Sequence, residues 1–346
     1  MAKAVTLKEI AERAGVSPMT VSHVLRDTGR ISAQTRERVQ QVANKLGHRP
    51  NASAQSMRSG RYGNVALVLS TDEARSAINA DVLKGVHRAL ARERMHLSMA
   101  ELDDNRLSSD GYMSHILQSL AADGLLLNYK WRTPPELLAL IREFEMPAVW
   151  VADRYECDSV YPDLYHGMRE AIRRLVDLGH RRIAYAGSHA AAPPDTSHVH
   201  YSVVDCESAY ADAMTEAGLQ GDLLPPGGVA TLLDTLRQPR RPTALVCRGI
   251  HFANFARLAA SEAGLNVPRD LSIVPLCHDA RRWLGLPFAQ VLMPSLHLGE
   301  AAVGMLVEKI ANPTRRIPSK PIPMPWRDGP TLAAPCGGTR GQGRAS

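Results

Sequence analysis

Polar side chains that can bind nucleic acid are concentrated near the N-terminus of this 346-residue chain. Between residues 17 and 26, serine and threonine hydroxyls, the imidazole of His23 and the guanidinium of Arg26 follow one another closely. Hydroxyls can bind base edges or phosphates, whereas His and Arg can reach the acceptor atoms of guanine. This combination makes duplex DNA the first candidate partner.

The distribution of charge supports this candidate. Residues 1–62 contain eleven Lys and Arg against four acidic residues, a net charge of +7, which leaves −1 for the rest of a chain whose total is +6. A basic head on a nearly neutral body is typical of nucleic-acid-binding proteins. A charged, solvated helical surface would give the same balance, so charge alone does not decide the function.

The other reactive side chains form no catalytic or metal-binding pattern. The sequence contains no phosphate-binding loop, no G-x-S-x-G motif and no recognisable pairing of a nucleophile with a base. His189, His198 and His200 fall in a Pro- and Ala-rich stretch that we expect to be a solvated loop. The five cysteines are scattered without a C-x-x-C pair, which disfavours a disulfide framework or a zinc site. We therefore expect no enzyme activity, no metal and no cofactor.

Predicted helices position the N-terminal polar residues. Thr6 and Glu9 form a capping box that begins a helix over residues 7–14, and Gly15 ends this helix in a left-handed conformation. A Ser-Pro pair then begins a second helix over residues 18–25, because serine caps the free N–H groups and proline fits the first helical position.

A third predicted helix, over residues 33–46, completes the module. Two short helices joined by a turn that contains glycine, and braced by a third helix, follow the helix-turn-helix plan, in which the second helix enters the major groove. A three-helix bundle without a DNA partner is the alternative. The residues of this module expected to contact DNA are Thr6, Leu7, Ser17, Pro18, Met19, Thr20, Ser22, His23, Arg26, Arg30, Ser32 and Thr35.

From residue 63 onward, apolar runs of strand length alternate with helical stretches, which predicts parallel sheets covered on both faces. The predicted strands are too numerous for a single sheet, so we expect two doubly wound α/β subdomains. The predicted strands are 64–70, 96–101, 124–128, 148–152, 182–187, 243–247, 271–276 and 289–292. The predicted helices are 80–95, 112–121, 134–144, 164–178, 207–217, 252–263 and 300–310.

No apolar run is long enough to span a bilayer, and the N-terminus lacks the apolar core of a secretory signal. We therefore expect a cytoplasmic, nucleoid-associated protein with no membrane partner. The Gly- and Arg-rich tail, residues 332–346, is expected to be disordered.

Several stretches of the sequence match a known pattern of bacterial regulators. They are Val5-Thr6-Leu7-Lys8-Glu9-Ile10-Ala11, Ala14-Gly15-Val16-Ser17, Thr20-Val21-Ser22, residues 31–39, Gly179-His180-Arg181-Arg182-Ile183-Ala184, Pro242-Thr243-Ala244 and residues 267–274. Over residues 5–331 the chain resembles the LacI/GalR family. The resemblance implies a repressor that binds a pseudo-palindromic operator as a homodimer or tetramer. It also implies a periplasmic-binding-protein-like domain that closes on a small-molecule effector.

The resemblance also divides the chain. It implies a helix-turn-helix headpiece over residues 1–49, a hinge over 50–62 and an effector-binding and dimerisation domain over 63–331, with crossovers between subdomains near 152–162 and 288–296. In the hinge, Asn51 and Ala54 match groove-facing positions, and Met57 occupies the position that wedges between base steps. The resemblance implies a short helix in this hinge, and a helix of one or two turns is only marginally stable alone. A flexible linker that becomes ordered on binding DNA is compatible with this interpretation.

The sequence departs from the family at recognition positions. His23 stands where the family usually has a base-contacting Arg. In the effector domain, amides and carboxylates that bind sugar hydroxyls are missing, which argues against an ordinary hexose. A different ligand, a partner protein and a weakened response remain open. Residues placed near the cleft are Ser70, Asp153, Arg154, Arg248 and His278, which lie at C-terminal strand ends, and Cys206, which aligns with a ligand-gripping Arg of the family.

Each of these cleft residues could equally be a satisfied structural polar group. A small-molecule carrier or an enzyme with a vestigial head is the alternative for the whole chain. The intact set of helix caps and the basic charge of the head speak against this alternative.

Overall fold

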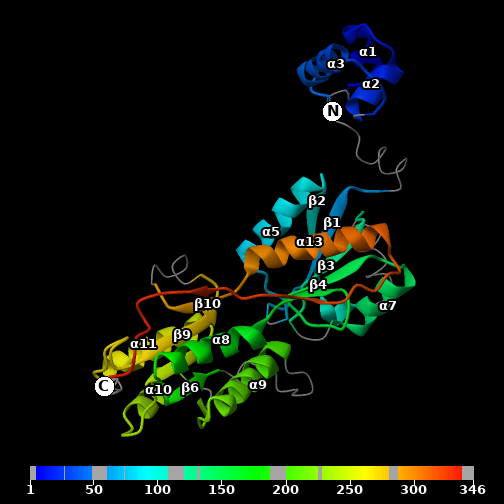
Figure 1. The fold of residues 1–346 in the computed structure, drawn as a ribbon. Coiled ribbons are helices and arrows are strands. Elements are labelled where there is room, and N and C mark those ends of the chain that lie inside the picture. Colours follow the sequence, from blue (N-terminus) through cyan, green and yellow to red (C-terminus); the bar gives the residue numbers. More distant parts are fainter. Residues whose placement is uncertain are drawn as a thin grey trace, which may run out of the picture. The chain divides into compact units, whose positions relative to one another are not determined.

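The computed structural model describes residues 5–26, 28–48, 61–73, 75–107, 121–130, 133–187, 200–224, 228–279 and 287–336. The chain divides into two compact units, Met1–Tyr62 and Gly63–Ser346, which we treat separately (Figure 1). None of the described helices combines the length and the apolar character needed to cross a membrane.

The first unit is a three-helix module that matches the predicted elements closely. Helices α1 (Leu7–Ala14), α2 (Pro18–Leu25) and α3 (Ala33–Lys45) begin at the capping residues expected from the sequence. Ile10, Val21 and Val39 are fully buried at the centre of its core. The predicted helix-turn-helix headpiece is therefore confirmed.

The second unit consists of two lobes, each built on a six-stranded sheet. We call the first the N-lobe; its strands lie in the order β11-β5-β4-β3-β1-β2, and every neighbouring pair is parallel. Its elements are β1 (Asn64–Ser70), α5 (Ala80–Arg92), β2 (His96–Leu102), β3 (Gly124–Leu127), α7 (Pro135–Glu143), β4 (Ala148–Val151), β5 (Ser159–Pro162), α13 (Ser295–Ala311) and β11 (Lys320–Ile322), with a 3₁₀ turn at Asp104–Arg106.

The C-lobe sheet has the order β12-β10-β9-β8-β6-β7, and only the β10–β12 pair is antiparallel among these strands. Its elements are α8 (Leu164–Asp177), β6 (Ile183–Ala186), α9 (Tyr201–Glu216), β7 (Asp222–Leu224), α10 (Val229–Leu236), β8 (Ala244–Arg248), α11 (Ile250–Glu262), β9 (Ser272–Cys277), β10 (Gln290–Leu292) and β12 (Trp326–Arg327).

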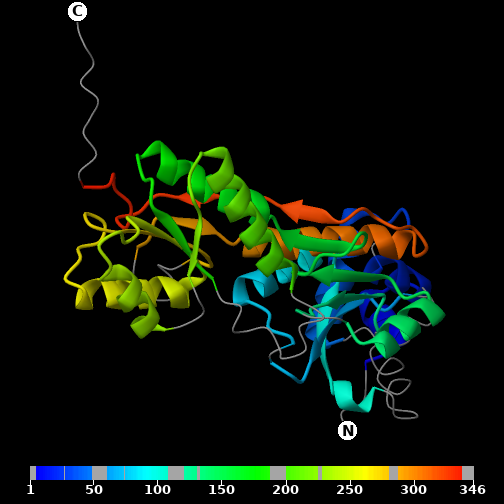
Figure 2. The same cartoon turned by 90° about the horizontal axis from the view of Figure 1, so that it is seen from below.

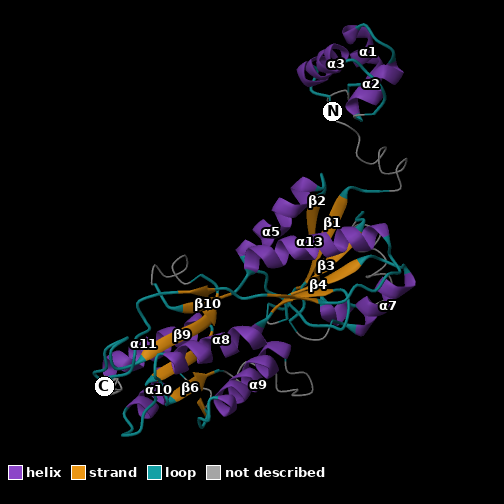
Figure 3. Ribbon diagram, in the orientation of Figure 1, coloured by secondary structure: helices purple, strands orange, loops and turns teal. Residues whose placement is uncertain are grey.

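Helices cover both faces of each sheet, as Figure 3 shows in purple and orange. Because successive strand residues point to opposite faces, Val65 and Leu67 pack against α5 and α13, whereas Ala66 and Val68 pack against α7. In the C-lobe the same alternation sends Tyr185 toward α8 and α9. The other face of that sheet packs against α10 and α11. The expectation of two doubly wound subdomains is confirmed.

The chain crosses between the lobes three times. It passes from β5 to α8, returns from β10 to α13, and passes again from β11 to β12. The first two crossings fall at or next to the ranges expected from the sequence, but the third was not predicted. Figure 2 shows this last segment, in red, running along both lobes.

The structure corrects several expectations. The short strands β5, β7, β11 and β12 and the helix α10 were missed, and α9 begins six residues before its predicted start. Disorder from residue 332 is wrong for 332–336, because the Ala333 carbonyl accepts hydrogen bonds from His180 Nε2 at 2.8 Å and Ser272 Oγ at 3.0 Å. Most of the predicted helix 112–121 and the rest of the tail lie outside the described residues.

Candidate functional site

The first helix of the headpiece is fixed at both ends by its own sequence. The Thr6 N–H donates to Glu9 Oε2 at 2.7 Å, and the Glu9 N–H donates to Thr6 Oγ1 at 3.3 Å, which completes the capping box. Gly15 ends the helix with a φ of 64°, a conformation that glycine adopts without strain. This end sets the direction in which the chain enters the next helix.

Helix α2 presents the candidate recognition surface. Ser17 Oγ accepts the Thr20 N–H at 3.1 Å, and Pro18 follows at the first helical position. Because Val21 and Val24 point into the core, the opposite face of the helix is left to solvent. On that face the side chain of Met19 is 71% exposed, which is unusual for a large apolar residue. An exposed methionine beside hydroxyls suits contact with a thymine methyl group.

Two polar residues at the end of α2 are held by their own chain. Arg26 Nε donates to the Ser22 carbonyl at 3.1 Å, and its Nη2 donates to Ser22 Oγ. His23 Nδ1 lies 3.2 Å from Thr28 Oγ1, with its ring against Gly29. The sequence predicted that both side chains point away from the core. The structure adds that these local hydrogen bonds fix their positions at the end of α2.

The beginning of α3 forms the second part of the surface. Ser32 Oγ accepts the Thr35 N–H at 3.3 Å, and both residues are near the helix N-terminus, where the backbone dipole favours anions. Arg30 is exposed just before this cap. This arrangement suits phosphate contacts. The hinge residues Asn51, Ala54 and Met57 lie outside the described residues.

A cleft between the N-lobe and the C-lobe is the second candidate site. A cavity of about 240 Å³ is lined from both lobes, and it includes Arg248 and His278 among the residues expected from the sequence. A neighbouring hollow of about 490 Å³ shares these two residues and extends along α11. The polar lining residues Asn128, Arg248 and His278 follow or end parallel strands, which is where such sheets bind ligands.

Four of the expected cleft residues have other surroundings. Ser70 Oγ donates to Asp104 Oδ2 at 2.7 Å, so this hydroxyl is bonded within the N-lobe and does not line the cavity. Arg154 Nη1 donates to both carboxylate oxygens of Asp205 at 2.8 Å, and its guanidinium lies 5.3 Å from the Tyr201 ring centre. This pair joins the end of β4 in the N-lobe to α9 in the C-lobe.

Asp153 is buried next to this pair. Its Oδ1 lies 3.7 Å from His200 Nε2 and accepts the Arg154 N–H at 2.8 Å. Burial raises the pKa of Asp153 to about 6, against the opposing hydrogen bond from Arg154. Burial also lowers the pKa of His200 to about 4, with a smaller effect from the positive charge of Arg248. At neutral pH Asp153 is therefore ionised and His200 is neutral.

Cys206 does not line the cleft. Its side chain is fully buried in the C-lobe core, and burial raises the pKa of its thiol to about 11. Since α9 begins at Tyr201, the first turn of the helix reaches the cavity in place of Cys206: Tyr201 and Ser202 line it. The placement of His200 in a solvated loop is also wrong, because its side chain is only 13% exposed, caps α9 and lines the cavity.

Sequence reasoning missed other lining residues. Asn128 ends the predicted strand 124–128, Lys130 lies two residues beyond it, and Ser295 comes soon after the last predicted strand, at the second crossing. The rule that ligands bind at the carboxyl ends of parallel strands could have found all three. His278 Nδ1 lies 2.8 Å from Ser295 Oγ, and burial lowers the pKa of His278.

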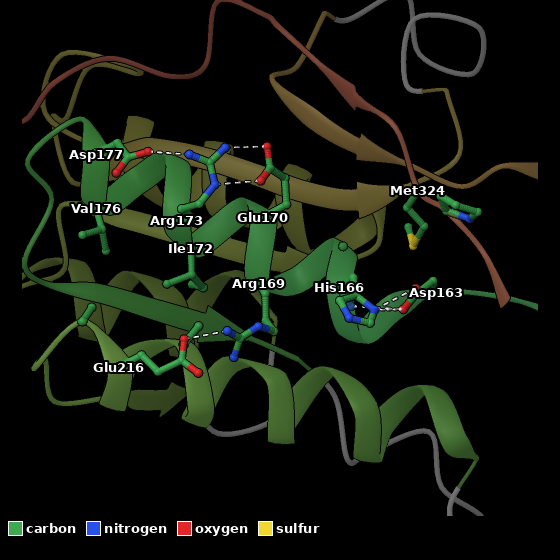
Figure 4. Close-up of a pocket in the computed structure, with 14 residues that line it drawn as sticks. Asp163, His166, Arg169, Glu170, Ile172, Arg173, Val176, Asp177, Glu216 and Met324 are labelled. Carbon is green, nitrogen blue, oxygen red and sulfur yellow. Dashed lines mark hydrogen bonds and ion pairs between the residues drawn. The ribbon is translucent and has the colours of Figure 1, made fainter.

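A separate hollow of about 560 Å³ lies along α8 and α9 (Figure 4). Its charged side chains pair with one another: Arg169 with Glu216 at 2.5 Å, and Arg173 with Glu170 at 2.9 Å. These pairs direct their charges toward each other, so we assign this hollow no ligand. Among the described residues, no group of three His, Cys, Asp or Glu side chains is arranged to hold a metal ion.

Comparisons with known proteins agree with this geometry. Residues 6–51 match the family described as bacterial regulatory proteins, lacI family, and residues 172–328 match the periplasmic binding protein-like domain. Over 313 residues the chain is 29% identical to the HTH-type transcriptional repressor PurR of Escherichia coli O139:H28 (strain E24377A / ETEC), covering 89% of this chain and 91% of the relative. The PurR protein of Shigella boydii serotype 18 (strain CDC 3083-94 / BS512) matches with the same identity and coverage.

Two solved structures share the fold over almost the whole chain. The lac repressor dimer bound to operator and the anti-inducer ONPF gives a TM-score of 0.72 at 21% identity, covering 96% of this chain and 100% of that chain. The complex of the transcriptional regulator CelR with cellobiose gives a TM-score of 0.61 at 23% identity, covering 95% and 100%. At these identities the likeness concerns the fold.

Proposed function

Because the chain is a member of the lacI family of bacterial regulatory proteins, we propose that it represses transcription from a pseudo-palindromic operator, which it binds as a homodimer. A small molecule in the cleft between the lobes modulates this binding. The proposal rests mainly on the face of α2, where a capped helix in a basic module presents Met19 and hydroxyl groups to solvent. In this proposal the protein acts at the nucleoid, in the cytoplasm, and has no catalytic role.

We infer the dimer from the proposed two-fold symmetry of the operator. A two-fold symmetric protein reads a site whose two halves mirror each other, with one recognition helix in each half. The relative named as a lac repressor dimer on its operator supports this arrangement. A tetramer built from two such dimers would carry two pairs of heads and would join two operators.

The hinge is proposed to contribute specificity through Met57. Replacing Met57→Gly removes the apolar wedge, so specific binding should weaken far more than binding to unrelated DNA. Competitive gel shifts with both DNAs measure the two losses. Equal losses on both would mean that the segment acts only as a tether.

Selection from a pool of random duplexes tests the function directly. The full chain should enrich an inverted repeat, and sedimentation of the purified complex should give two chains per duplex. A pool that stays random after repeated selection would contradict sequence-specific binding. Enrichment of a single, non-repeated half-site with one chain bound would contradict the homodimer.

A further inference from the structure

The cavity between the lobes has an unusual balance of charge. Lys130 enters it from the N-lobe, just after β3, and Arg248 enters it from the C-lobe, at the end of β8. None of the described residues that line this cavity is Asp or Glu. Lys130 is partly buried there, and this burial lowers the pKa of its ammonium group, with the charge of Asp72 opposing.

The remaining wall is mostly apolar. Side chains such as Ile78, Val82, Leu164, Met293 and Leu298 contribute to it from both lobes. A wall of this kind contacts the body of a ligand and excludes water, which strengthens any ionic contact inside. The cavity therefore suits a molecule with an apolar body and one negative group.

The neutral polar groups of the wall are already bonded to one another. Ser295 Oγ lies 2.8 Å from His278 Nδ1, and Ser202 Oγ lies 2.6 Å from His200 Nδ1 while it accepts Arg248 Nη2 at 2.7 Å. A polyhydroxylated sugar needs many amides and carboxylates that can form new hydrogen bonds. These internal pairs leave a sugar few such partners among the described lining residues.

One buried hydrogen-bond acceptor in the wall could accept a hydrogen bond from a ligand. Asn128 is 3% exposed, and its Nδ2 donates to the Val151 carbonyl at 3.1 Å. Its Oδ1 has no hydrogen-bond partner among the described residues, although it belongs to a side chain that lines the cavity. A buried acceptor without a partner costs free energy, so a ligand hydroxyl or N–H there would be favoured.

We propose that the cavity binds a small organic monoanion: a carboxylate held between Arg248 and Lys130, on an apolar or aromatic body that carries one hydrogen-bond donor for Asn128. This inference rests on the proposed function, because it names the chemical class of the effector. As a planar group with five donors, a guanidinium is suited to hold a carboxylate by two parallel hydrogen bonds. The charges come from opposite lobes, so the anion also draws the lobes together.

Paired probes test this assignment by calorimetry on the full chain without DNA. The acids are benzoate, 4-hydroxybenzoate, 4-hydroxyphenylacetate and mandelate, each compared with its own uncharged amide, and glucose is included. We expect at least one acid to bind about tenfold or more tightly than its amide, because a charge-assisted hydrogen bond is lost in the amide. Among the benzoates, the hydroxylated acid should bind more tightly than benzoate itself.

Variants assign the effect to the cavity. Arg248→Gln and Lys130→Gln should each reduce the preference for the acid about tenfold, with little change for the amide. Arg88→Gln removes the same charge from an exposed position on α5 and should leave the preference intact. Thermal melts establish that each variant is folded.

The proposal is overturned if an amide or glucose binds as tightly as the best acid. It is equally overturned if none of the four acids binds, or if Arg88→Gln lowers the preference as much as Arg248→Gln. Operator binding is measured separately. A protein that selects an operator but ignores the acids overturns this inference alone, whereas one that binds acids but not DNA overturns the proposed repressor alone.

Discussion

At the end of α2, the side chains of His23 and Arg26 form hydrogen bonds within their own chain. Arg26 bonds to Ser22, and His23 lies 3.2 Å from the hydroxyl of Thr28. The sequence could predict which face of the helix they occupy, because that follows from the burial of Val21 and Val24. It could not predict these bonds, since they depend on rotamers and on the path of the following loop.

The same distinction holds in the cleft. Arg248 and His278 were found because they lie at strand ends, where the rule for parallel sheets is independent of the ligand. Cys206 was misplaced because the start of α9 is set by His200, whose capping role has no strong sequence signal. One helical turn therefore decided which residues face the cavity.

Asp153 and His200 should make opposite contributions to the pH dependence of stability. The pKa of Asp153 is raised to about 6 in the folded state, so its unfavourable contribution is absent below pH 3.8, grows as the pH rises from 3.8 to 6 and is complete above 6. The pKa of His200 is lowered to about 4, so its cost appears as the pH falls from 6.5, where the unfolded chain takes up the proton.

Asp153→Asn should therefore stabilise the protein at pH 7 by up to about 3 kcal/mol, a gain that shrinks as the pH approaches 4. His200→Gln should show the opposite trend, with its effect on stability becoming more favourable as the pH falls from 6.5 to 4. Urea unfolding across this range measures both. A gain for Asp153→Asn that does not vary with pH would contradict the assignment.

At the scale of elements, the crossing of α5 and α13 depends on two glycines. A Cβ added to Gly299 would overlap the Val82 carbonyl oxygen, and one added to Gly85 would overlap the Leu296 carbonyl oxygen. The two backbones thus approach more closely than alanine permits. Gly304 lies in the same helix α13, is exposed, and has open space at its Cβ position.

Gly299→Ala should destabilise the protein by about 3 kcal/mol, because the helices must move apart to admit the methyl group. Gly304→Ala is the matched control and should be neutral or stabilising by up to about 1 kcal/mol, since alanine favours the helix. Denaturant unfolding measures both changes. Similar changes for the two variants would show that the close crossing has no special role.

Elements differed in how well the sequence predicted them. The headpiece helices were predicted almost to the residue because their caps are local: a serine or threonine, a proline and a glycine at fixed spacing. The strands β11 and β12 have three and two residues, too few to show alternation. Their existence depends on pairing with β5 and β10, which only the folded chain brings together.

At the scale of the whole effector unit, the lobes are joined by three crossings of the chain and, among the described residues, by the ion pair of Arg154 with Asp205. The pattern of strands predicted two lobes, but the third crossing leads to a two-residue strand that no pattern could reveal. The pair of Arg154 and Asp205 connects the lobes beside the cavity, with Asp205 only 10% exposed. We expect this pair to stabilise the contact between the lobes.

A double-mutant cycle on Arg154→Ala and Asp205→Ala should give a coupling free energy of about 1 kcal/mol, reduced from the value of a fully buried pair because Arg154 is 40% exposed. The exposed pair of Arg173 and Asp177 on α8 is the control, and its coupling should be about 0.5 kcal/mol or less. Urea unfolding gives both values. Purely additive losses at Arg154 and Asp205 would show that this pair does not connect the lobes energetically.

If α2 reads base sequence in a dimeric complex, the protein must prefer its operator over other DNA at every salt concentration, and a salt series of fluorescence anisotropy measures this preference directly. The full chain is titrated with the selected inverted repeat and with a scrambled duplex of equal composition. Affinity for both should fall as salt rises, because basic residues displace counterions. At physiological salt the repeat should still bind about 10³-fold or more tightly than the scrambled duplex. Equal affinities that vanish together as salt rises would contradict the claim.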